Sequence, residues 1–453
     1  MTLPDPGLAS PILASPGVAK PGLASPEFTG RTGAVLERLH GLYPVLIDLS
    51  LGRLETLLAK LGHPERHLPP VIHVAGTNGK GSTCASLRAI AEASGWIVHV
   101  STSPHLVDVT ERFRVAGRLV SDLALTHMLE EIERVNAGAP ITVFEVLTAA
   151  GFMLFSRSPA DLAIIEVGLG GRFDASNVVP PPAACVITAI SMDHEAFLGD
   201  TLAQIATEKA GIIKPGTPVV TGRQAKPVLA VLVDEAARVG ATLLVRDRDW
   251  SIERASEGLR YLDRSGALIL PMPALPGAHQ IENAGLAVAA LRAVGLAVPS
   301  HGWAGLAGTT WPARLQRLTG RLASGLPDGW ELWLDGGHNP GAAAVLSDVL
   351  EGWSDRPVHL VIGMKQSKDA QGFLRPLLGH AASVHAVAEP GQHLALPVAE
   401  IVAASDGKAV PGPTVAASLS AIVAAHPAPG RILICGSLYL AGEVLKADGW
   451  QPS

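Results

Sequence analysis

Cysteine is scarce in this chain. The three cysteines, Cys84, Cys185 and Cys435, lie far apart and form no CxxC or metal-binding spacing. This distribution excludes a disulfide-stabilised scaffold and indicates a reducing compartment, so we expect a cytoplasmic protein.

Long apolar runs and a large charge excess are also missing. The mean hydropathy is +0.30, but charged residues or prolines interrupt every apolar run before it reaches the roughly 18–20 residues of a membrane-spanning helix. The net charge of −6, from 35 basic and 41 acidic residues, is too small to suggest nucleic-acid binding. We therefore expect neither a membrane nor a nucleic acid as a partner.

Glycine and proline are plentiful instead. The 48 glycines and 35 prolines are typical of a loop-rich α/β enzyme. Proline is dense in residues 1–30, where Leu-Ala-Ser-Pro occurs three times, starting at Leu8, Leu13 and Leu23. This segment has no basic start, and prolines interrupt its apolar residues, so it is unlike a signal peptide. We expect a disordered leader outside the fold.

Short apolar strands alternate with helical patterns in the rest of the chain, which implies a parallel sheet covered on both faces. We predict a P-loop-type α/β domain with a mostly parallel sheet over residues 31–310, and a smaller Rossmann-like α/β domain over residues 311–453. The boundary follows the glycine-rich segment Val298–Gly308. The expected strands are 71–74, 96–100, 162–167, 184–190, 218–221, 330–334, 358–363 and 431–435, and the expected helices are 81–94, 201–210 and 341–353.

A glycine-rich loop between a buried strand and a helix predicts a phosphate site. Its residues are Gly76, Thr77, Asn78, Gly79, Lys80, Gly81 and Ser82. Glycines let the backbone N–H groups point at a phosphate, while the lysine can bridge phosphates and the serine can bind Mg²⁺. The spacing departs from the common Walker form, because only two residues separate the first two glycines. The alternative is a tight structural turn.

Two further strands end in polar residues, where ligands bind in open α/β sheets. Glu166 ends one strand and suits Mg²⁺, unless it merely pairs with Arg172. Asp193-His194 follows the next strand, and His194 either binds a metal or orients a carboxylate or phosphate. In the second unit, Asp335 follows a strand in the same way, with a structural turn as the alternative. Taken alone, Lys209 and Arg314 would be surface charges.

Together these motifs resemble the folylpolyglutamate synthase and dihydrofolate synthase family of the Mur ligase superfamily, from about residue 34 to the C-terminus. The resemblance rests on Gly76–Ser82, Ser103-Pro104-His105-Leu106, Glu166–Arg172, Asp193-His194, Glu208–Ile212, His279-Gln280 with Asn283, Asp335-Gly336 with His338-Asn339-Pro340, and Gly436–Leu440. Three positions depart from the family pattern: Ser50 and Ala313 stand where glycine is usual, and Gly337 stands where alanine is usual.

The resemblance implies roles for individual residues. Gly79, Lys80 and Ser82 would bind the phosphates of ATP, with Asn283, Arg314 and Asp335 as further nucleotide contacts. Ser82, Glu166 and His194 would hold Mg²⁺, as two ions, together with a carbamylated Lys209. Lys80, His194 and Lys209 would be catalytic. The substrate-binding set would be Asp48, Ser103, Pro104, His105, Phe144, Glu145, Arg172, Phe173 and His338.

The activity implied by the resemblance is ATP-dependent ligation of L-glutamate to dihydropteroate, tetrahydrofolate or both, through an acyl phosphate, by a monomer. A peptidoglycan-precursor ligase of the same superfamily is an alternative, although Ser103–Leu106 and Glu166–Arg172 argue against it. A regulatory or transport module that hydrolyses nucleotide without ligation is a second alternative. Phosphate release that requires glutamate and a pterin would distinguish the ligase from this module.

Overall fold

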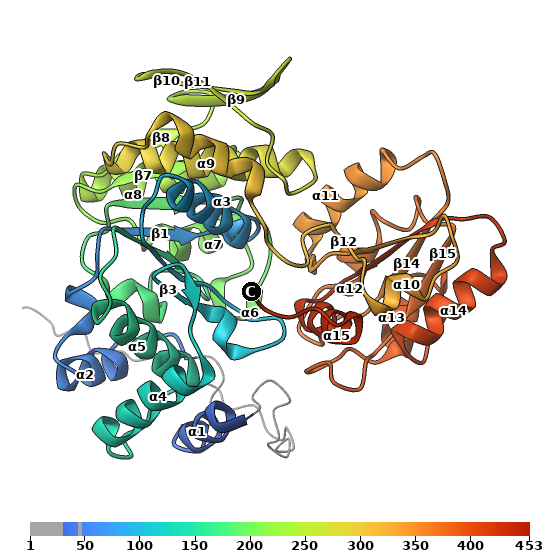
Figure 1. The fold of residues 1–453 in the computed structure, drawn as a ribbon, viewed down its shortest axis with the longest axis horizontal. Helices are drawn as coiled ribbons and strands as arrows, with labels where there is room; N and C mark the ends of the chain where they lie inside the picture. The colour runs from blue at the N-terminus through green and yellow to red at the C-terminus, as the bar shows by residue number, and fades with distance from the viewer. Residues whose placement is uncertain (1–29, 44–47) are drawn as a thin grey trace, which may run out of the picture.

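The computed structural model describes residues 30–43 and 48–453, which form two α/β bodies (Figure 1). The first body contains an eight-stranded sheet and a three-stranded sheet, and the second contains a six-stranded sheet. The predicted leader lies outside the described residues up to residue 29. Helix α1 begins at Gly30.

The large sheet of the first body is parallel at its centre, with the order β4-β3-β2-β5-β1-β6-β7-β8. β1 pairs in parallel with both β5 and β6, whereas β3 and β4 add an antiparallel edge. The strands are β1 (Val71–Ala75), β2 (Val98–Ser101), β3 (Phe113–Val115), β4 (Arg118–Leu119), β5 (Leu162–Glu166), β6 (Ala184–Ile187), β7 (Pro218–Thr221) and β8 (Thr242–Val245). The mostly parallel sheet is confirmed, although β6 is shorter than the predicted strand 184–190.

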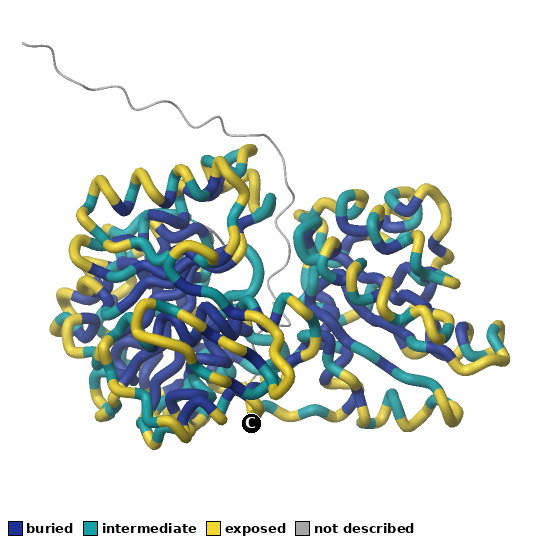
Figure 2. The backbone as a smooth tube through the Cα atoms, turned by 90° about the horizontal axis from the view of Figure 1, so that it is seen from above, coloured by how far each residue is buried: buried dark blue, intermediate teal, exposed yellow. Residues whose placement is uncertain are grey.

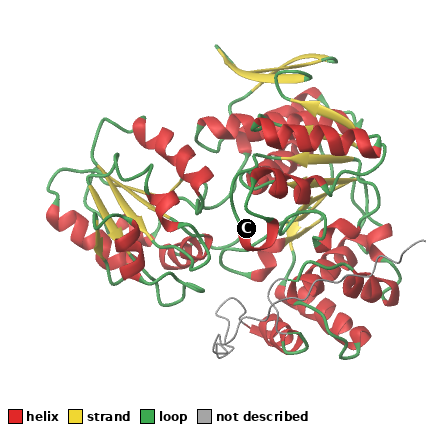
Figure 3. Ribbon diagram, turned by 180° about the vertical axis from the view of Figure 1, so that it is seen from behind, coloured by secondary structure: helices red, strands yellow, loops and turns green. Residues whose placement is uncertain are grey.

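Helices cover both faces of this sheet (Figure 3). Side chains alternate along β1, so that Ile72 and Val74 pack towards one face while Val71 and Ala75 pack towards the other. The first face carries α3 (Lys80–Ala93) and α9 (Ala278–Val294). The other face carries α1 (Gly30–His40), α2 (Gly52–Lys60), α4 (Asp122–Asn136), α5 (Val143–Ser156), α7 (Leu202–Ala210) and α8 (Lys226–Val239).

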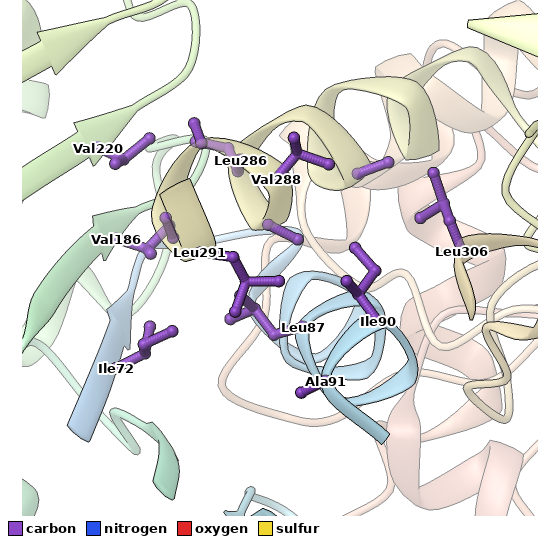
Figure 4. Packing of buried hydrophobic residues seen from close by; sticks show 14 of the residues in the cluster. Ile72, Leu87, Ile90, Ala91, Val186, Val220, Leu286, Val288, Leu291 and Leu306 are labelled. Atoms are coloured by element: carbon purple, nitrogen blue, oxygen red, sulfur yellow. The ribbon is translucent and has the colours of Figure 1, made fainter. Parts of the chain in front are cut away.

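The packing in Figure 4 holds α3 in place. Leu87 and Ile90 of α3 are fully buried, as are Ile72 of β1 and Leu291 of α9 in the same cluster. Burial of each such side chain contributes about 1.5–3 kcal/mol to folding. Because α3 is held along its length, its first residue, Lys80, is fixed beside the end of β1.

A three-stranded antiparallel sheet was not predicted from the sequence. It comprises β9 (Trp250–Ala255), β10 (Gly258–Asp263) and β11 (Gly266–Leu270), and it lies beyond α9 at the top of Figure 1. Gly285 of α9 leaves room for the ring of Trp250, because a Cβ atom at this glycine would lie 2.7 Å from that ring. The small sheet is thereby anchored on the outer side of α9.

The second body has a sheet with the order β12-β13-β17-β14-β15-β16. All neighbours are parallel except β12 and β13. Figure 2 shows buried strands at the centre of each body, with partly exposed helices around them. The strands are β12 (Gln316–Arg317), β13 (Glu331–Leu334), β14 (Val358–Ile362), β15 (Ser383–Ala386), β16 (Ala409–Pro411) and β17 (Arg431–Cys435); the helices are α10 (Arg321–Ser324), α11 (Pro340–Glu351), α12 (Ala370–Leu374), α13 (Val398–Ala404), α14 (Val415–Ala425) and α15 (Leu438–Asp448).

The glycine-rich segment before the second body is a 3-10 helix, η4 (Ser300–Gly308), that packs on α3. A Cβ atom at Gly305 would collide with the carbonyl of Ala89, so glycine permits this close contact. The chain then crosses to β12, and the division at residue 310 stays a prediction. Within residues 30–43 and 48–453, no helix has the length and apolar character needed to cross a membrane.

Candidate active site

The loop between β1 and α3 requires glycine at two positions. Gly76 and Gly79 have φ angles of +149° and +90°. A Cβ atom at Gly76 would collide with Thr188, and one at Gly79 would collide with the side-chain amide of Asn283. The two glycines therefore allow the compact loop and helix start that attract phosphate groups.

A cavity of about 290 Å³ brings most of the predicted site residues together. It is lined from both bodies, because the ends of β1, β5 and β6 face the ends of β13 and β17 across it. The predicted residues that line it are Gly76, Thr77, Asn78, Gly79, Lys80, Gly81, Ser82, Ser103, Pro104, Glu166, His194, Lys209, Asn283, Arg314, Asp335 and His338.

Lys80 lies over its own loop. Its Nζ donates hydrogen bonds to the carbonyl oxygens of Gly76 (3.1 Å) and Thr77 (3.3 Å). Ser82, in the first turn of the helix, is 1% exposed and lines the same cavity. The lysine thus places a positive charge where the loop can receive an anion.

Glu166 is buried at the end of β5, with 7% of its surface exposed. Its Oε2 accepts a hydrogen bond from the backbone N–H of Ser103 (3.2 Å). Burial raises the pKa of Glu166, while the charge of Lys80 acts in the opposite direction. Arg172, the partner considered in the alternative interpretation, instead lies over the ring of Phe173 at 5.0 Å.

Asp193 is the centre of a charged cluster after β6. It lies 2.5 Å from Lys368 Nζ and 3.6 Å from His338 Nε2, and it accepts a hydrogen bond from the Asn339 amide (3.0 Å). Burial favours the neutral acid, but His338 and Lys368 outweigh it and hold the pKa of Asp193 far below its usual range. Burial and the charge of Lys368 lower the pKa of His194 to about 3, which leaves a neutral imidazole.

Lys209 is not a surface lysine. It is 4% exposed near the end of α7, and its Nζ donates a hydrogen bond to the carbonyl oxygen of Gly76 (2.9 Å). Burial and then the charge of Lys80 lower the pKa of Lys209 to about 7. A lysine in this environment has a substantial neutral fraction near neutral pH.

A reciprocal amide pair joins the two bodies beside the phosphate loop. The Asn78 amide donates to Asn339 Oδ1, and the Asn339 amide donates to Asn78 Oδ1, both at 3.0 Å. Asn339 Oδ1 also accepts from the backbone N–H of Ala342 (2.9 Å) and so caps α11. One residue thus holds the start of a helix in the second body against the loop of the first.

Asp335 organises the crossing segment around Arg314. Its two carboxylate oxygens accept hydrogen bonds from the backbone N–H groups of Leu315 and Gly337, each at 2.7 Å. Ala313 and Leu315 have positive φ angles of 53° and 43°. A positive φ is the conformation that glycine adopts at least cost, so a glycine at position 313 would take this backbone conformation more easily than Ala313 does.

Part of the predicted substrate-binding set forms a separate network. Arg53 lies 2.9 Å from the carboxylate of Asp48 and 3.1 Å from that of Glu145. Glu145 also accepts a hydrogen bond from the backbone N–H of Thr142 (2.8 Å) in the capping box of α5. The structure therefore gives Glu145 a role in holding α5, in addition to any contact with a ligand.

The remaining predicted substrate residues do not line the 290 Å³ cavity. Phe144 lines a small pocket next to it, together with Ser103 and Glu166. His105 receives a hydrogen bond from Arg112 Nε at 3.0 Å. Phe173, whose ring is covered by Arg172, is 40% exposed.

Lys368 is a site residue that the sequence analysis missed. It is buried against Asp193 and lies 3.3 Å from His194 Nε2. It follows β14, so the rule that polar residues gather at the carboxyl ends of parallel strands applies to it as to Glu166. The sequence does not single out Lys368, because Lys365 lies in the same loop and a lysine in a loop is ordinarily solvated.

Two protein families match the chain. The Mur ligase middle domain matches residues 74–291, and the C-terminal domain of dihydrofolate synthetase matches residues 327–447. The dihydrofolate synthase/folylpolyglutamate synthase of Escherichia coli is 35% identical over 414 residues, covering 91% of this chain and 94% of the relative.

Solved structures agree with these matches. Escherichia coli FolC in complex with DHPP and ADP has a TM-score of 0.83 and 33% identity, covering 92% of this chain and 97% of that chain. A bifunctional folylpolyglutamate synthase/dihydrofolate synthase with Mn, AMPPNP and L-glutamate bound has a TM-score of 0.81 and 30% identity, covering 93% and 99%. The chain therefore belongs to the folylpolyglutamate synthase and dihydrofolate synthase family of Mur ligases.

Proposed function

We propose that this protein is an ATP-dependent ligase that joins L-glutamate to dihydropteroate, tetrahydrofolate or both. The observation that carries the proposal is the single cavity that unites the phosphate loop of the first body with Asp335 and His338 of the second. Family membership supports the same reaction. The site between two bodies also suits a reaction whose intermediate must be kept from water.

Amide formation from a free carboxylate in water is unfavourable, so the carboxylate must first be activated. The γ-phosphoryl group of ATP is transferred to the carboxylate of the acceptor, which gives an acyl phosphate and ADP. The α-amine of glutamate then attacks the acyl carbon, and phosphate leaves. Lys80 and the loop N–H groups hold the phosphates and neutralise the charge that develops on them.

A divalent cation fits the residues at the phosphate loop. Ser82, Glu166 and His194 line one cavity, and Glu166 is a buried carboxylate held by the backbone N–H of Ser103. Within the described ranges, no group of three or more His, Cys, Asp or Glu side chains is placed to hold a metal unaided. Mg²⁺ commonly takes one or two protein ligands with substrate phosphates and water, and when bound it neutralises phosphate charge.

We further propose that Lys209 is carbamylated in the active enzyme and that two ions bind. Its burial, its place in the cavity and its contact with Gly76 support this role. Carbamylation requires the neutral amine, which the lowered pKa provides. Carbamylation replaces the ammonium cation of Lys209 with a carbamate, whose oxygens supply the metal with a further anionic ligand.

The same proposal extends to the pterin site, the oligomeric state and the cellular location. The pterin lies near Phe144, Phe173 and Asp48, beside the pocket shared with Ser103 and Glu166. The enzyme acts as a monomer. The three cysteines are free and buried, which agrees with a cytoplasmic location.

The proposed reaction is tested by measuring ADP formation with each substrate omitted in turn. We expect ADP to form only when ATP, glutamate and either dihydropteroate or tetrahydrofolate are present. Ligation to one acceptor alone would define a single activity. ADP formation that is independent of glutamate and acceptor would contradict ligation and favour a nucleotide-hydrolysing module.

A further inference from the structure

Three polar side chains at the start of α9 form a chain of hydrogen bonds that ends at the phosphate loop. His279, Gln280 and Asn283 all line the 290 Å³ cavity. Gln280 Nε2 lies 3.0 Å from His279 Nε2, and the Asn283 amide donates to Gln280 Oε1 at 2.9 Å. Gln280 and Asn283 are 2% and 6% exposed, so a broken bond between them would leave buried polar groups unsatisfied.

Asn283 is the end of the chain that meets the loop. Its Oδ1 is the side-chain atom nearest to Gly79, because a Cβ atom at this glycine would lie 2.4 Å from Oδ1 and 3.4 Å from Nδ2. A side-chain amide offers an acceptor on one side and a donor on the other. The orientation of Asn283 therefore decides whether the loop and its ligand meet an oxygen atom or an amino group.

The other end of the chain fixes this orientation. Donors and acceptors must alternate along the chain, so two arrangements satisfy both hydrogen bonds. In the observed arrangement, Asn283 donates to Gln280 Oε1 and Gln280 Nε2 donates to His279 Nε2, which must be unprotonated. In the reverse arrangement, His279 Nε2 carries a proton, the Gln280 amide is turned over, and Asn283 directs Nδ2 towards Gly79. The position of one proton on His279 thus selects the atom of Asn283 that faces the loop.

The surroundings of His279 favour a neutral ring. Burial lowers the pKa of His279, against the charge of Asp335 and together with that of Arg314, so the imidazole is neutral at neutral pH. Its place in the first turn of α9 also disfavours an imidazolium, because the N-terminal end of a helix carries positive potential. The neutral ring carries its proton on Nδ1, a buried atom with no hydrogen-bond partner among the residues that the structure describes. The bond to Gln280 therefore holds this tautomer.

We propose that His279 is a positioning residue, because its unprotonated Nε2 orients the Gln280 amide and Gln280 in turn holds Asn283 with its oxygen towards the phosphate loop. The proposal rests on the proposed function, since the orientation of Asn283 acts through ATP bound at that loop. His279 acts through its neighbours and need not touch the nucleotide. Loss of the chain should raise the KM for ATP and leave kcat nearly unchanged.

Nitrogen-15 NMR of protein labelled at histidine measures the state of the His279 ring. Near neutral pH we expect a neutral ring with its proton on Nδ1, whereas free neutral histidine favours a proton on Nε2. The signal is assigned by its absence from His279→Phe. In Gln280→Glu the carboxylate accepts from both neighbours, so the proton on the ring should move to Nε2. A proton on Nε2 in the parent protein would overturn the proposal.

Equilibrium binding of ADP measures the consequence at the loop. Gln280→Met removes both hydrogen bonds, so we expect its Kd for ADP to rise roughly threefold to tenfold, and His279→Phe should have a similar effect. Gln280→Glu still accepts from Asn283 and should bind ADP more tightly than Gln280→Met does, despite its added negative charge. His301→Phe, at an exposed histidine of η4 outside the cavity, is the control and should leave the Kd unchanged.

Equal Kd values for ADP in the parent protein, Gln280→Met and His279→Phe would overturn the proposal. Circular dichroism checks that these variants fold, and the NMR measurement on the parent protein tests the proposal even if one of them does not. That measurement needs no nucleotide. A parent protein that shows the expected tautomer but binds no ADP would overturn the proposed function instead.

Discussion

At the scale of single residues, Gly79 combines a conformational and a steric requirement. Gly79→Ala places a methyl group at a positive φ and against Asn283, so we expect the KM for ATP to rise about tenfold. Gly62 has a similar φ of +81°, but no atom lies within 4 Å of the position that a methyl group would take there. Gly62→Ala should therefore cost about 1 kcal/mol in stability and leave the KM for ATP unchanged. Equal KM values for the two variants would contradict the steric argument.

Lys80 places its side-chain ammonium over the phosphate loop, within hydrogen-bond distance of two loop carbonyls. We expect Lys80→Ala to lower turnover by a factor corresponding to roughly 2–4 kcal/mol of transition-state stabilisation, while the circular dichroism spectrum stays the same. Lys226→Ala, at an exposed helix start, is the control. Turnover of Lys80→Ala within about tenfold of the parent enzyme would contradict its role.

Unlike Lys80, Lys209 is proposed to carry a carbamate on its side-chain nitrogen. Lys209→Ala should be nearly inactive, and a small carboxylic acid in the medium should restore part of the rate by replacing the carbamate. Carbon-13 NMR of protein supplied with labelled bicarbonate should show a carbamate signal that this variant lacks. An active enzyme without that signal would leave Lys209 as an unmodified buried amine.

Most of the residues predicted for the site line one cavity, for a physical reason. Parallel strands bring their carboxyl ends to one edge, so polar residues after apolar strands converge, as Glu166 and Asp335 do. The same reasoning could not reveal that Glu145 caps α5, because a capping carboxylate and a binding carboxylate have the same sequence signature. Lys368 was not predicted, because only its tertiary contact with Asp193 distinguishes it from a solvated lysine.

At the scale of elements, Asn339 serves both as the N-cap of α11 and as the link to Asn78. Serine is as good an N-cap as asparagine but is too short to keep the reciprocal amide pair. Asn339→Ser should therefore lower the melting temperature less than Asn339→Ala does, and it should raise the KM for ATP. Asn339→Ala should also lose about 1 kcal/mol of stability, because the cap is lost as well.

Equal melting temperatures for these two variants would show that the cap contributes little. An unchanged KM for ATP in Asn339→Ser would show that the link to Asn78 is not needed for the nucleotide. Kinetics and thermal unfolding together thus separate the two roles.

The elements themselves were predictable to different degrees. Continuous apolar runs such as Leu162–Glu166 predict a buried parallel strand, and the helix predicted at 81–94 is observed at Lys80–Ala93. The sheet of β9, β10 and β11 was missed although glycines, Gly258 and Gly266, begin its second and third strands. Its strands are as long as those that were predicted, but many of their residues are exposed, so their apolar signal is weak and packing on α9 decides their structure.

At the scale of the whole molecule, histidines whose pKa is lowered in the folded state make stability depend on pH. Burial lowers the pKa of six histidines: His73 and His194 to about 3, His359 to about 4, and also His99, His279 and His385. Below pH ~6.5 the unfolded chain takes up protons that the folded chain does not, until the pH reaches the folded pKa. The stability contributed by these histidines is therefore present at neutral pH and is lost as the pH is lowered, whereas Glu166 and Asp174, whose pKa values burial raises, act in the opposite direction.

We expect the free energy of unfolding in urea to fall between pH 6.5 and 4, with His73 alone accounting for about 1.4 kcal/mol per pH unit. His73→Asn should reduce the slope by that amount, because asparagine does not titrate. The exposed His67 provides the control His67→Asn, which should leave the slope unchanged. A pH-independent free energy of unfolding over this range would contradict the argument.

The link between Asn78 and Asn339 forms only after both residues have been synthesised. The two residues are 261 positions apart in the chain. At ~5–20 residues per second, a ribosome needs roughly 15–50 s to reach the second after making the first. During that interval a nascent first body could already bind nucleotide, but it would lack the groups from Asp335 onwards, so phosphoryl transfer would begin only once the later part of the polypeptide has emerged and folded.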